Sequence, residues 1–432
     1  MSQKVADRSR RTDSAVPGAL VILLVTTALM LMGSGLFSTL VGIRGHDEGF
    51  SSTVIGIIAA GYFMGYIAGA FLCVRAIANV GHIRTFSALS AMVCAAAVAH
   101  LLWVDAVAWF VFRVLAGMCI VGMFLVIESW LVAVSSPGTR GRIFALYMGV
   151  NLLAMAAGQV LLVMPIIEGF KLFGLAAILL ALAVVPTALT RVEAPLPEPA
   201  GGLRMGELFR TSSLGFASCL VIGVVGGSFW GLAPVYAAQT GGGDAAVGIF
   251  MMAAILGGMV SQWPAGRFSD RHDRVAVMSA VALVLSLSTL FGGLFNAQWN
   301  IPPALIGFVF GVCYFPLYPL AVAHTHDHAG PANVVSATRG LMLVYGIGAI
   351  IGPVMAGWLM AQRGPHALFL FQGVMGALLA CGAVAWRRRH TAAPSAVKST
   401  FVPMMRTSQE ALVLSEELAS GAPDRPQGSD TG

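Results

Sequence analysis

The chain has 432 residues, of which 57% are hydrophobic and only 10% are charged, whereas soluble domains carry about 25% charged residues. The formal net charge of +6 does not indicate nucleic-acid binding, because the arginines lie beside apolar segments and no aromatic-basic RNA motif accompanies them. The six cysteines all fall in apolar runs without paired spacing, so we interpret them as small core residues and expect neither a disulfide framework nor a zinc site. The composition predicts a polytopic membrane protein.

The first apolar run, residues 17–43, follows a basic stretch from Lys4 to Arg11. It is longer than the roughly 7–15 residues of a signal-peptide core, and no small-residue cleavage site closes it. We therefore predict a retained first span, preceded by a short cytosolic tail over residues 1–16.

Apolar runs long enough to cross about 30 Å of hydrocarbon as helices occur twelve times, which predicts an all-α membrane fold. The first six cover residues 17–43, 53–74, 83–104, 106–134, 143–167 and 172–189. The second six cover residues 214–238, 247–265, 275–295, 301–323, 334–361 and 367–386.

Lysine and arginine fall almost entirely on one side of these twelve spans. With the N-terminus inside, the outer loops hold only Arg44, Lys171 and Arg363. Because positive residues accumulate on the cytosolic side of membrane proteins, both termini are predicted to be cytosolic, in the cell's inner (plasma) membrane.

A linker rich in proline and glycine, residues 191–213, separates two sets of six spans, over residues 17–190 and 214–386. The two sets also match each other in sequence at an offset of 192, and such a register is expected of a duplicated half. The matching positions include Gly56 and Gly248, Gly65 and Gly257, Arg75 and Arg267, and Ser87 and Ser279. The tail, residues 387–432, is predicted to be cytosolic and mostly disordered.

The fourth span carries two charges, Arg113 and Glu128. Each costs roughly 2.5–3.5 kcal/mol near the centre of a membrane helix, so both are expected to face a bundle interior or a water-filled path. They lie about 22 Å apart along the helix and about 60° around it, so they share a face without touching. A carboxylate that alternates between an apolar and a cationic surrounding can bind and release a proton, and a purely structural ion pair is the alternative. The best candidate for the cation that pairs with Glu128 is Arg339, which is also a predicted cytosolic gate residue; Arg140 and Arg142 are the alternatives.

The interior loop after the eighth span resembles a signature of the major facilitator superfamily, Gly-x-x-x-Asp-Arg-x-Gly-Arg, which that family carries after its second and eighth spans. Gly266, Asp270, Arg271 and Arg274 match it, while Asp273 replaces the second glycine. The resemblance implies two pseudo-twofold six-helix bundles. Asp270 is expected to accept hydrogen bonds at the start of the next helix and to pair with an arginine, latching the two halves on the cytosolic side. The alternative is that these charges only enforce topology.

In the first half the aspartate position is Ala78, and the gate residue that remains there is Arg75. The second loop is therefore expected to carry more of the latch. Arg113-x-x-x-Gly117 resembles a second signature, which the family links to proton movement; a structural arginine at a helix kink is the alternative.

The resemblance also implies that the first, fourth, seventh and tenth spans line a central cavity. Polar and aromatic residues near mid-span are candidates for the substrate or proton pathway, although an individual Trp or Tyr is more often an interface anchor or a packing residue. They are Ser34, Phe37, Asn151, Gln159, Trp230, Tyr314, Tyr318 and Tyr345.

No enzyme is predicted, because no catalytic triad, phosphate loop or kinase pattern occurs. The histidine-rich stretch from His324 to His328 is interpreted as a solvated interior loop and not as a metal site. The predicted function is secondary active transport of a small organic solute by alternating access, with a proton as the coupling ion, no cofactor, and a monomer in the bilayer. Drug or metabolite efflux and a non-transporting membrane sensor are the alternatives.

Overall fold

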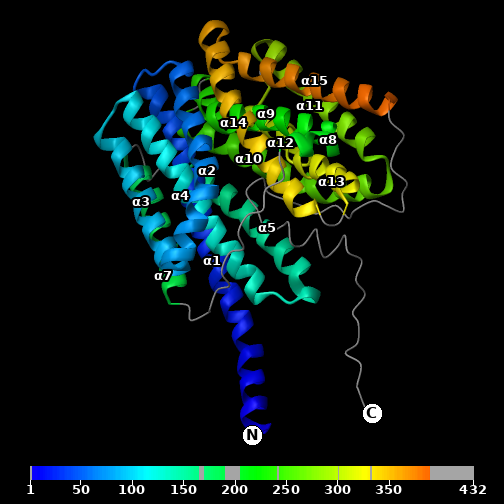
Figure 1. Ribbon diagram of the computed structural model, residues 1–432. Helices are drawn as coiled ribbons and strands as arrows, with labels where there is room; N and C mark the ends of the chain where they lie inside the picture. Colours follow the sequence, from blue (N-terminus) through cyan, green and yellow to red (C-terminus); the bar gives the residue numbers. More distant parts are fainter. Residues whose placement is uncertain are drawn as a thin grey trace.

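The computed structural model describes residues 2–164, 170–189, 205–240, 243–299, 301–330 and 333–389. All regular structure in these ranges is helical, and twelve helices are long and apolar enough to cross a membrane. The predicted all-α membrane fold with twelve spans is confirmed (Figure 1).

The first half contains six spans, the sixth of which is broken into two helices. They are α1 (Ser2–Asp47), α2 (Ser52–Val80), α3 (His82–Leu102), α4 (Ala106–Val134), α5 (Pro137–Val160), α6 (Phe170–Leu182) and α7 (Val184–Ala188). The second half also contains six spans. The tenth span of the chain, which is the fourth of this half, is broken into two helices. Its helices are α8 (Met205–Thr211), α9 (Ser213–Gln239), α10 (Gly243–Arg271), α11 (Arg274–Trp299), α12 (Pro303–Tyr314), α13 (Leu317–Ala329), α14 (Val334–Arg363) and α15 (Ala367–Arg389).

Local capping sets several of these boundaries. The Asp105 carboxylate accepts a hydrogen bond from the Ala108 amide at the start of α4. Ser136 and Thr139 form a capping box that starts α5 at Pro137, six residues before the predicted span, and α5 ends at Val160 instead of residue 167. Gly81, with φ of 92°, separates α2 from α3 because this backbone region favours glycine.

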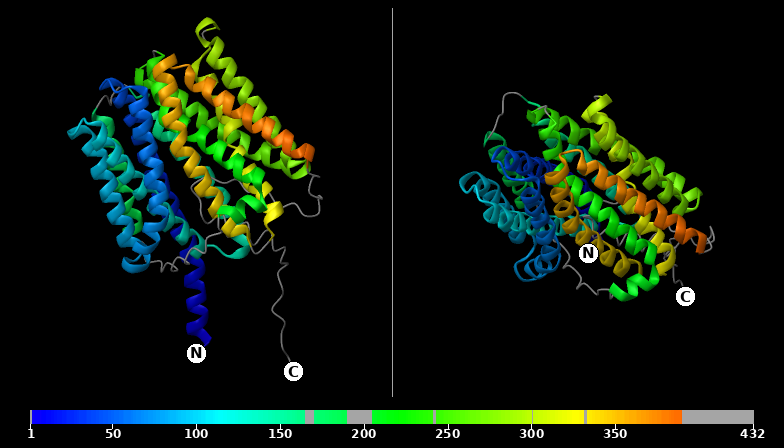
Figure 2. Two further views of the ribbon diagram at one scale, coloured as in Figure 1. Left: turned by 45° about the horizontal axis from the view of Figure 1, so that its top comes forward. Right: turned by 90° about the horizontal axis from the view of Figure 1, so that it is seen from above.

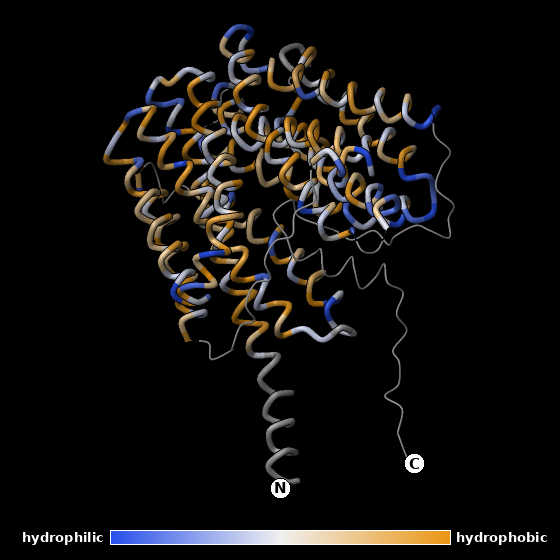
Figure 3. The backbone as a smooth tube through the Cα atoms, viewed as in Figure 1, coloured by the Kyte–Doolittle hydropathy of each residue, from blue (hydrophilic) through white to orange (hydrophobic). Residues whose placement is uncertain are grey.

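Two further boundaries differ from the prediction. The part of the predicted linker that is described includes a helix, α8, and the N-terminal tail is helical from Ser2. The remaining linker residues 191–204 and the tail from residue 390 lie outside the described residues. Figure 3 shows hydrophobic residues along most of each span and hydrophilic residues gathered where helices end, which is the distribution expected of helices surrounded by lipid.

Glycine contacts show that the two halves are built alike. Gly65 of α2 packs on the Val114 carbonyl of α4, and Gly117 of α4 packs on the Tyr62 carbonyl of α2. The same reciprocal contact recurs between α10 and α12, where Gly257 faces the Phe308 carbonyl and Gly311 faces that of Ala254. Small residues allow membrane helices to approach this closely. The predicted duplication therefore extends from sequence to packing.

The two halves touch along α2 with α14, α5 with α10, and α1 with α9. We call this set of contacts the interhalf seam. The Thr53 hydroxyl donates to the Gly357 carbonyl at 3.4 Å, and the Gln239 amide donates to the Ser52 hydroxyl at 3.5 Å. Both contacts lie at the end of the spans opposite to most of the arginines. Figure 2 shows the first half, mostly in blue and cyan, beside the second half, in green to orange.

We call the arginine-bearing end of the spans the basic end and the opposite end the far end. The basic end carries Arg75, Arg84, Arg140, Arg142, Arg210, Arg271, Arg274 and Arg387 to Arg389.

Candidate functional site

The guanidinium of Arg113 is buried inside the first half, where three neutral side chains surround it. Its Nη2 donates to the Ser38 hydroxyl of α1 at 3.1 Å. Its Cζ lies 4.6 Å from the ring centre of Tyr62 on α2 and 5.6 Å from that of Phe37 on α1. A cation over aromatic faces gains about 0.5–2 kcal/mol. Arg113 thus points away from lipid, as predicted for a charged residue in this span.

Phe37 occupies a packing position. Its ring meets His100 of α3 at 5.2 Å and Phe173 of α6 at 6.2 Å, both edge to face. These neighbours belong to the outer side of the first half, so Phe37 supports the Arg113 guanidinium from within the bundle.

Glu128 is also buried, with 1% of its surface exposed, and lies closer to the basic end of α4. The Tyr147 hydroxyl of α5 donates to its carboxylate at 3.3 Å. Asn151 lies one turn further along α5, is 1% exposed, and interacts with the Tyr147 hydroxyl. Sequence reasoning missed Tyr147, which only the meeting of α4 and α5 brings to the glutamate.

Gln159 joins α5 to α1 near the interhalf seam. Its side-chain oxygen accepts a hydrogen bond from the Thr39 hydroxyl at 3.0 Å, while its amide nitrogen has no partner. The backbone carbonyl of Gln159 faces Gly248 of α10 in the other half.

Three of the predicted aromatic residues gather in the second half. The hydroxyls of Tyr314 on α12 and Tyr345 on α14 are 3.0 Å apart, against Gly226 of α9. The Tyr318 ring meets that of Tyr345 edge to face at 5.5 Å, and its buried hydroxyl has no hydrogen-bond partner. Trp230, half-buried on α9, packs against Phe315, which lies 6.2 Å away. The break between α12 and α13 at Pro316 lies next to Tyr314 and Tyr318 in the chain.

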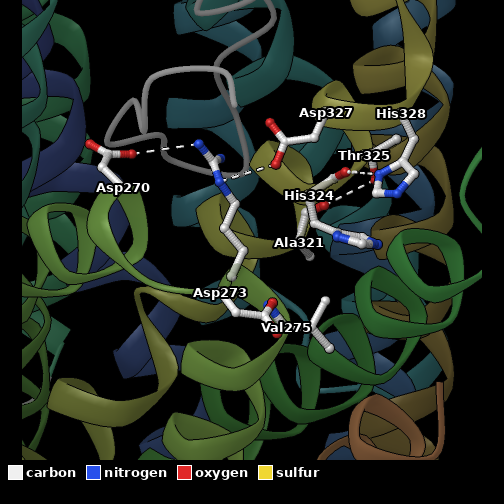
Figure 4. Close-up of polar contacts among 9 residues, drawn as sticks. Asp270, Asp273, Val275, Ala321, His324, Thr325, Asp327 and His328 are labelled. Atoms are coloured by element: carbon white, nitrogen blue, oxygen red, sulfur yellow. Dashed lines mark hydrogen bonds and ion pairs between the residues drawn. The ribbon is translucent and has the colours of Figure 1, made fainter. Parts of the chain in front are cut away.

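The basic end of the second half holds a cluster of ion pairs around Arg274 (Figure 4). Arg274 Nη2 lies 3.5 Å from Asp270 Oδ1, and Nε lies 3.2 Å from Asp327 Oδ2. The guanidinium and the Asp327 carboxylate are almost fully buried, whereas 39% of Asp270 is exposed. Arg387 pairs with Asp273 at 2.6 Å. Each of these pairs joins elements of the second half, and the latch across the halves stays a prediction.

Most residues of the signature lie in a helix and not in the predicted loop. Gly266, Asp270 and Arg271 belong to the last turns of α10, so the loop between α10 and α11 is only two residues long. At the start of α11 it is the Asp273 carboxylate that accepts a hydrogen bond, from the Val275 amide at 3.0 Å. The residue that departs from the family pattern thus forms the helix cap.

The interpretation of His324 to His328 as a solvated loop is wrong. These residues form the last turns of α13, where His324 packs edge to face on Trp386 of α15 and His326 Nε2 lies 2.6 Å from the Thr338 hydroxyl of α14. Packing against α14 and α15 extends the helix beyond the apolar run. Within the described part of the chain, no cluster of three metal-ligand side chains is found.

Two remaining gate candidates stand apart from this cluster. Arg75 is exposed at the end of α2, and Arg339 is half-buried near the start of α14 with its Nε unpartnered. Asp327 and Arg387, which sequence reasoning missed, hold the basic end of the second half together instead. In the sequence, the acidic character of Asp327 within the histidine stretch was the signal that could have identified it.

A family model described as "Major Facilitator Superfamily" matches residues 23–342 and 216–415. The chain belongs to the major facilitator superfamily. An uncharacterized MFS-type transporter of Yersinia pestis (strain Pestoides F) is 27% identical over 359 residues, covering 83% of this chain and 93% of the relative. The uncharacterized MFS-type transporter YcaD of Shigella flexneri serotype 5b is 29% identical over 363 residues, covering 81% and 91%.

Solved structures of this superfamily share the fold. The nucleoside transporter NupG superposes with a TM-score of 0.70 at 15% identity, over 85% of this chain and 98% of its own. A D-xylose-proton symporter superposes with a TM-score of 0.67 at 14% identity, over 84% and 96%. This multi-pass membrane protein is therefore a transporter by family, and it shares its fold with these two proteins.

Proposed function

We propose that this protein is a secondary active transporter that moves a small organic solute by alternating access between its two halves. The position of the contacts between the halves carries this proposal. At the far end, hydrogen bonds and close helix contacts join the halves through Ser52, Thr53 and Gly357. At the basic end, the ion pairs of Arg274 and Arg387 lie within the second half. This pattern favours a conformation closed at the far end, as one state of a rocking cycle requires.

The charge distribution supports an orientation for that cycle. Arginines concentrate at the basic end, and positively charged loops remain on the cytosolic side of membrane proteins. In this proposal the protein lies in the inner membrane with both termini in the cytosol, and the described state is inward-facing.

Proton coupling is proposed for Glu128. Its carboxylate is buried on α4 and accepts a hydrogen bond from the Tyr147 hydroxyl, which also interacts with Asn151. A group held in such a place changes its protonation when its polar neighbours move, and those neighbours lie on a different helix. Intramembrane carboxylates of this kind mark proton relays in transporters.

The test is solute flux in proteoliposomes under an imposed proton gradient, with accumulation above the external concentration as the expected result. Glu128→Gln is expected to abolish accumulation while retaining exchange of the solute down its own gradient. Truncation before His390 serves as the control and is expected to transport normally. Full gradient dependence in Glu128→Gln would exclude the coupling role, and the absence of flux of any solute would exclude transport.

A further inference from the structure

The charges around Arg113 do not balance. Its described contacts are the Ser38 hydroxyl and the Tyr62 and Phe37 rings, none of which carries a negative charge. In the described part of the chain, no ion pair joins Arg113 to a carboxylate. Its Nε is buried and has no hydrogen-bond partner among the residues that the structure describes. A guanidinium stays protonated when buried, so the site keeps a positive charge that nothing in its surroundings compensates.

Arg274 shows how the same fold treats a buried arginine that has a structural role. At 3% exposed it is as deeply buried as Arg113, which is 5% exposed. Two carboxylates lie against it, from Asp327 at 3.2 Å and from Asp270 at 3.5 Å. The contrast indicates that the missing anion at Arg113 comes from outside the chain.

The fold places the neighbours of Arg113 close to the interhalf seam. Ser38 lies one turn of α1 from Gly42, which packs on Pro234 of the second half. Tyr62 lies one turn of α2 from Ala59, the residue that touches Gly231 of α9. Ser38 and Tyr62 are only partly buried. Two residues that contact the guanidinium therefore lie one helical turn from the surface where the halves meet, and in the proposed cycle rocking of the halves opens access to it.

We infer that Arg113, with Ser38 and Tyr62, is the charge-recognising part of the solute site, and that the transported solute is a small organic anion. This inference rests on the proposed transport function. A carboxylate approaching the guanidinium edge accepts from the unpartnered Nε and from a terminal nitrogen, and its hydrocarbon body packs on the Tyr62 ring. Glu128, about 22 Å away along α4, is too distant to neutralise Arg113 or to repel this anion directly.

Matched probes that share a carbon skeleton and carry an anionic, neutral or cationic head group test the inference on the purified full-length protein. One set is indole-3-acetate, indole-3-acetamide and tryptamine, and a second is hexanoate, hexanamide and hexylamine. Thermal shift titration gives the Kd of each probe. The anion of a set is expected to bind at least tenfold more tightly than its amide, and the amine not at all. Equal binding of amide and anion, or no binding by either anion, would overturn the inference.

Variants assign the effect to the arginine. Arg113→Gln is expected to weaken binding of the anion at least tenfold, and Arg113→Lys to weaken it less, because an ammonium keeps the charge but loses the two-pronged geometry. Arg113→Lys also serves if the glutamine variant fails to fold. Arg363→Gln, which removes an exposed far-end arginine, is the control and is expected to bind as the wild type does. A Kd of the anion within twofold of wild type in both Arg113 variants would refute the assignment.

Flux measurements separate this inference from the proposed function. If proteoliposomes transport neutral or cationic solutes and Arg113→Gln transports them equally well, transport stands and the anion site is wrong. If the anion binds through Arg113 but no flux of any solute is found, the site stands and transport is wrong.

Discussion

Gly248 offers a direct way to shift the balance between the two access states. It lies on α10, where it packs across the interhalf seam against α5. A Cβ atom at this position would lie 2.7 Å from the Gln159 carbonyl oxygen and 2.9 Å from Leu162 Cβ. Ordinary carbon-oxygen contacts are about 3.3–3.6 Å, so Gly248→Ala requires the halves to separate by roughly 0.6 Å or more at the far end.

The cost of this separation falls on the closed far end alone, because the open state has no such contact in the proposed cycle. Overpacking costs about 1–3 kcal/mol, which shifts an equilibrium between two states by about 5- to 150-fold. Gly248→Ala is therefore expected to increase the population open at the far end by a factor in this range.

The assay is the labelling rate of a cysteine at Ser52 on a cysteine-free background, with a membrane-impermeant maleimide added to intact cells. Ser52 is 6% exposed and lies in the seam beside Gln239, so labelling reports opening of the far end. Gly149→Ala, which introduces a methyl group where nothing lies within 4 Å, is the matched control and is expected to leave the rate unchanged. Equal rates with and without Gly248→Ala would refute the reasoning.

Two further predictions concern stability. Asp327→Asn is expected to lower the free energy of unfolding by about 3–5 kcal/mol, because it leaves buried Arg274 without its closest carboxylate. Asp270→Asn is expected to lower it by only about 0–1 kcal/mol, since 39% of Asp270 is exposed. Urea unfolding in detergent measures both variants, and equal losses would contradict this description of the ion pairs. Gly117→Ala is expected to destabilise the first half by about 1–3 kcal/mol because its methyl group meets the Tyr62 carbonyl, and a melting temperature equal to that of wild type would contradict the close α2–α4 contact.

The sequence alone determined the membrane class, the twelve spans and their division into two similar sets. These properties follow from run length, from the placement of arginine and from a repeated register, all of which are local or periodic features. It also singled out Arg113 and Glu128, because a charge within an apolar helix is conspicuous wherever that helix packs.

Tertiary structure decided which side chains share a site. Nothing near Glu128 in the sequence points to Tyr147, and Ser38 and Tyr62 reach Arg113 only because α1 and α2 pack on α4. The histidine stretch was misinterpreted for the same reason, since its polarity indicates solvent until α14 and α15 are seen to cover it. Helix formation depends on residues that are close in the chain, whereas burial and pairing depend on residues that are far apart in the sequence. The charge of Arg113 was therefore visible in the sequence, but its lack of a partner was visible only in the fold.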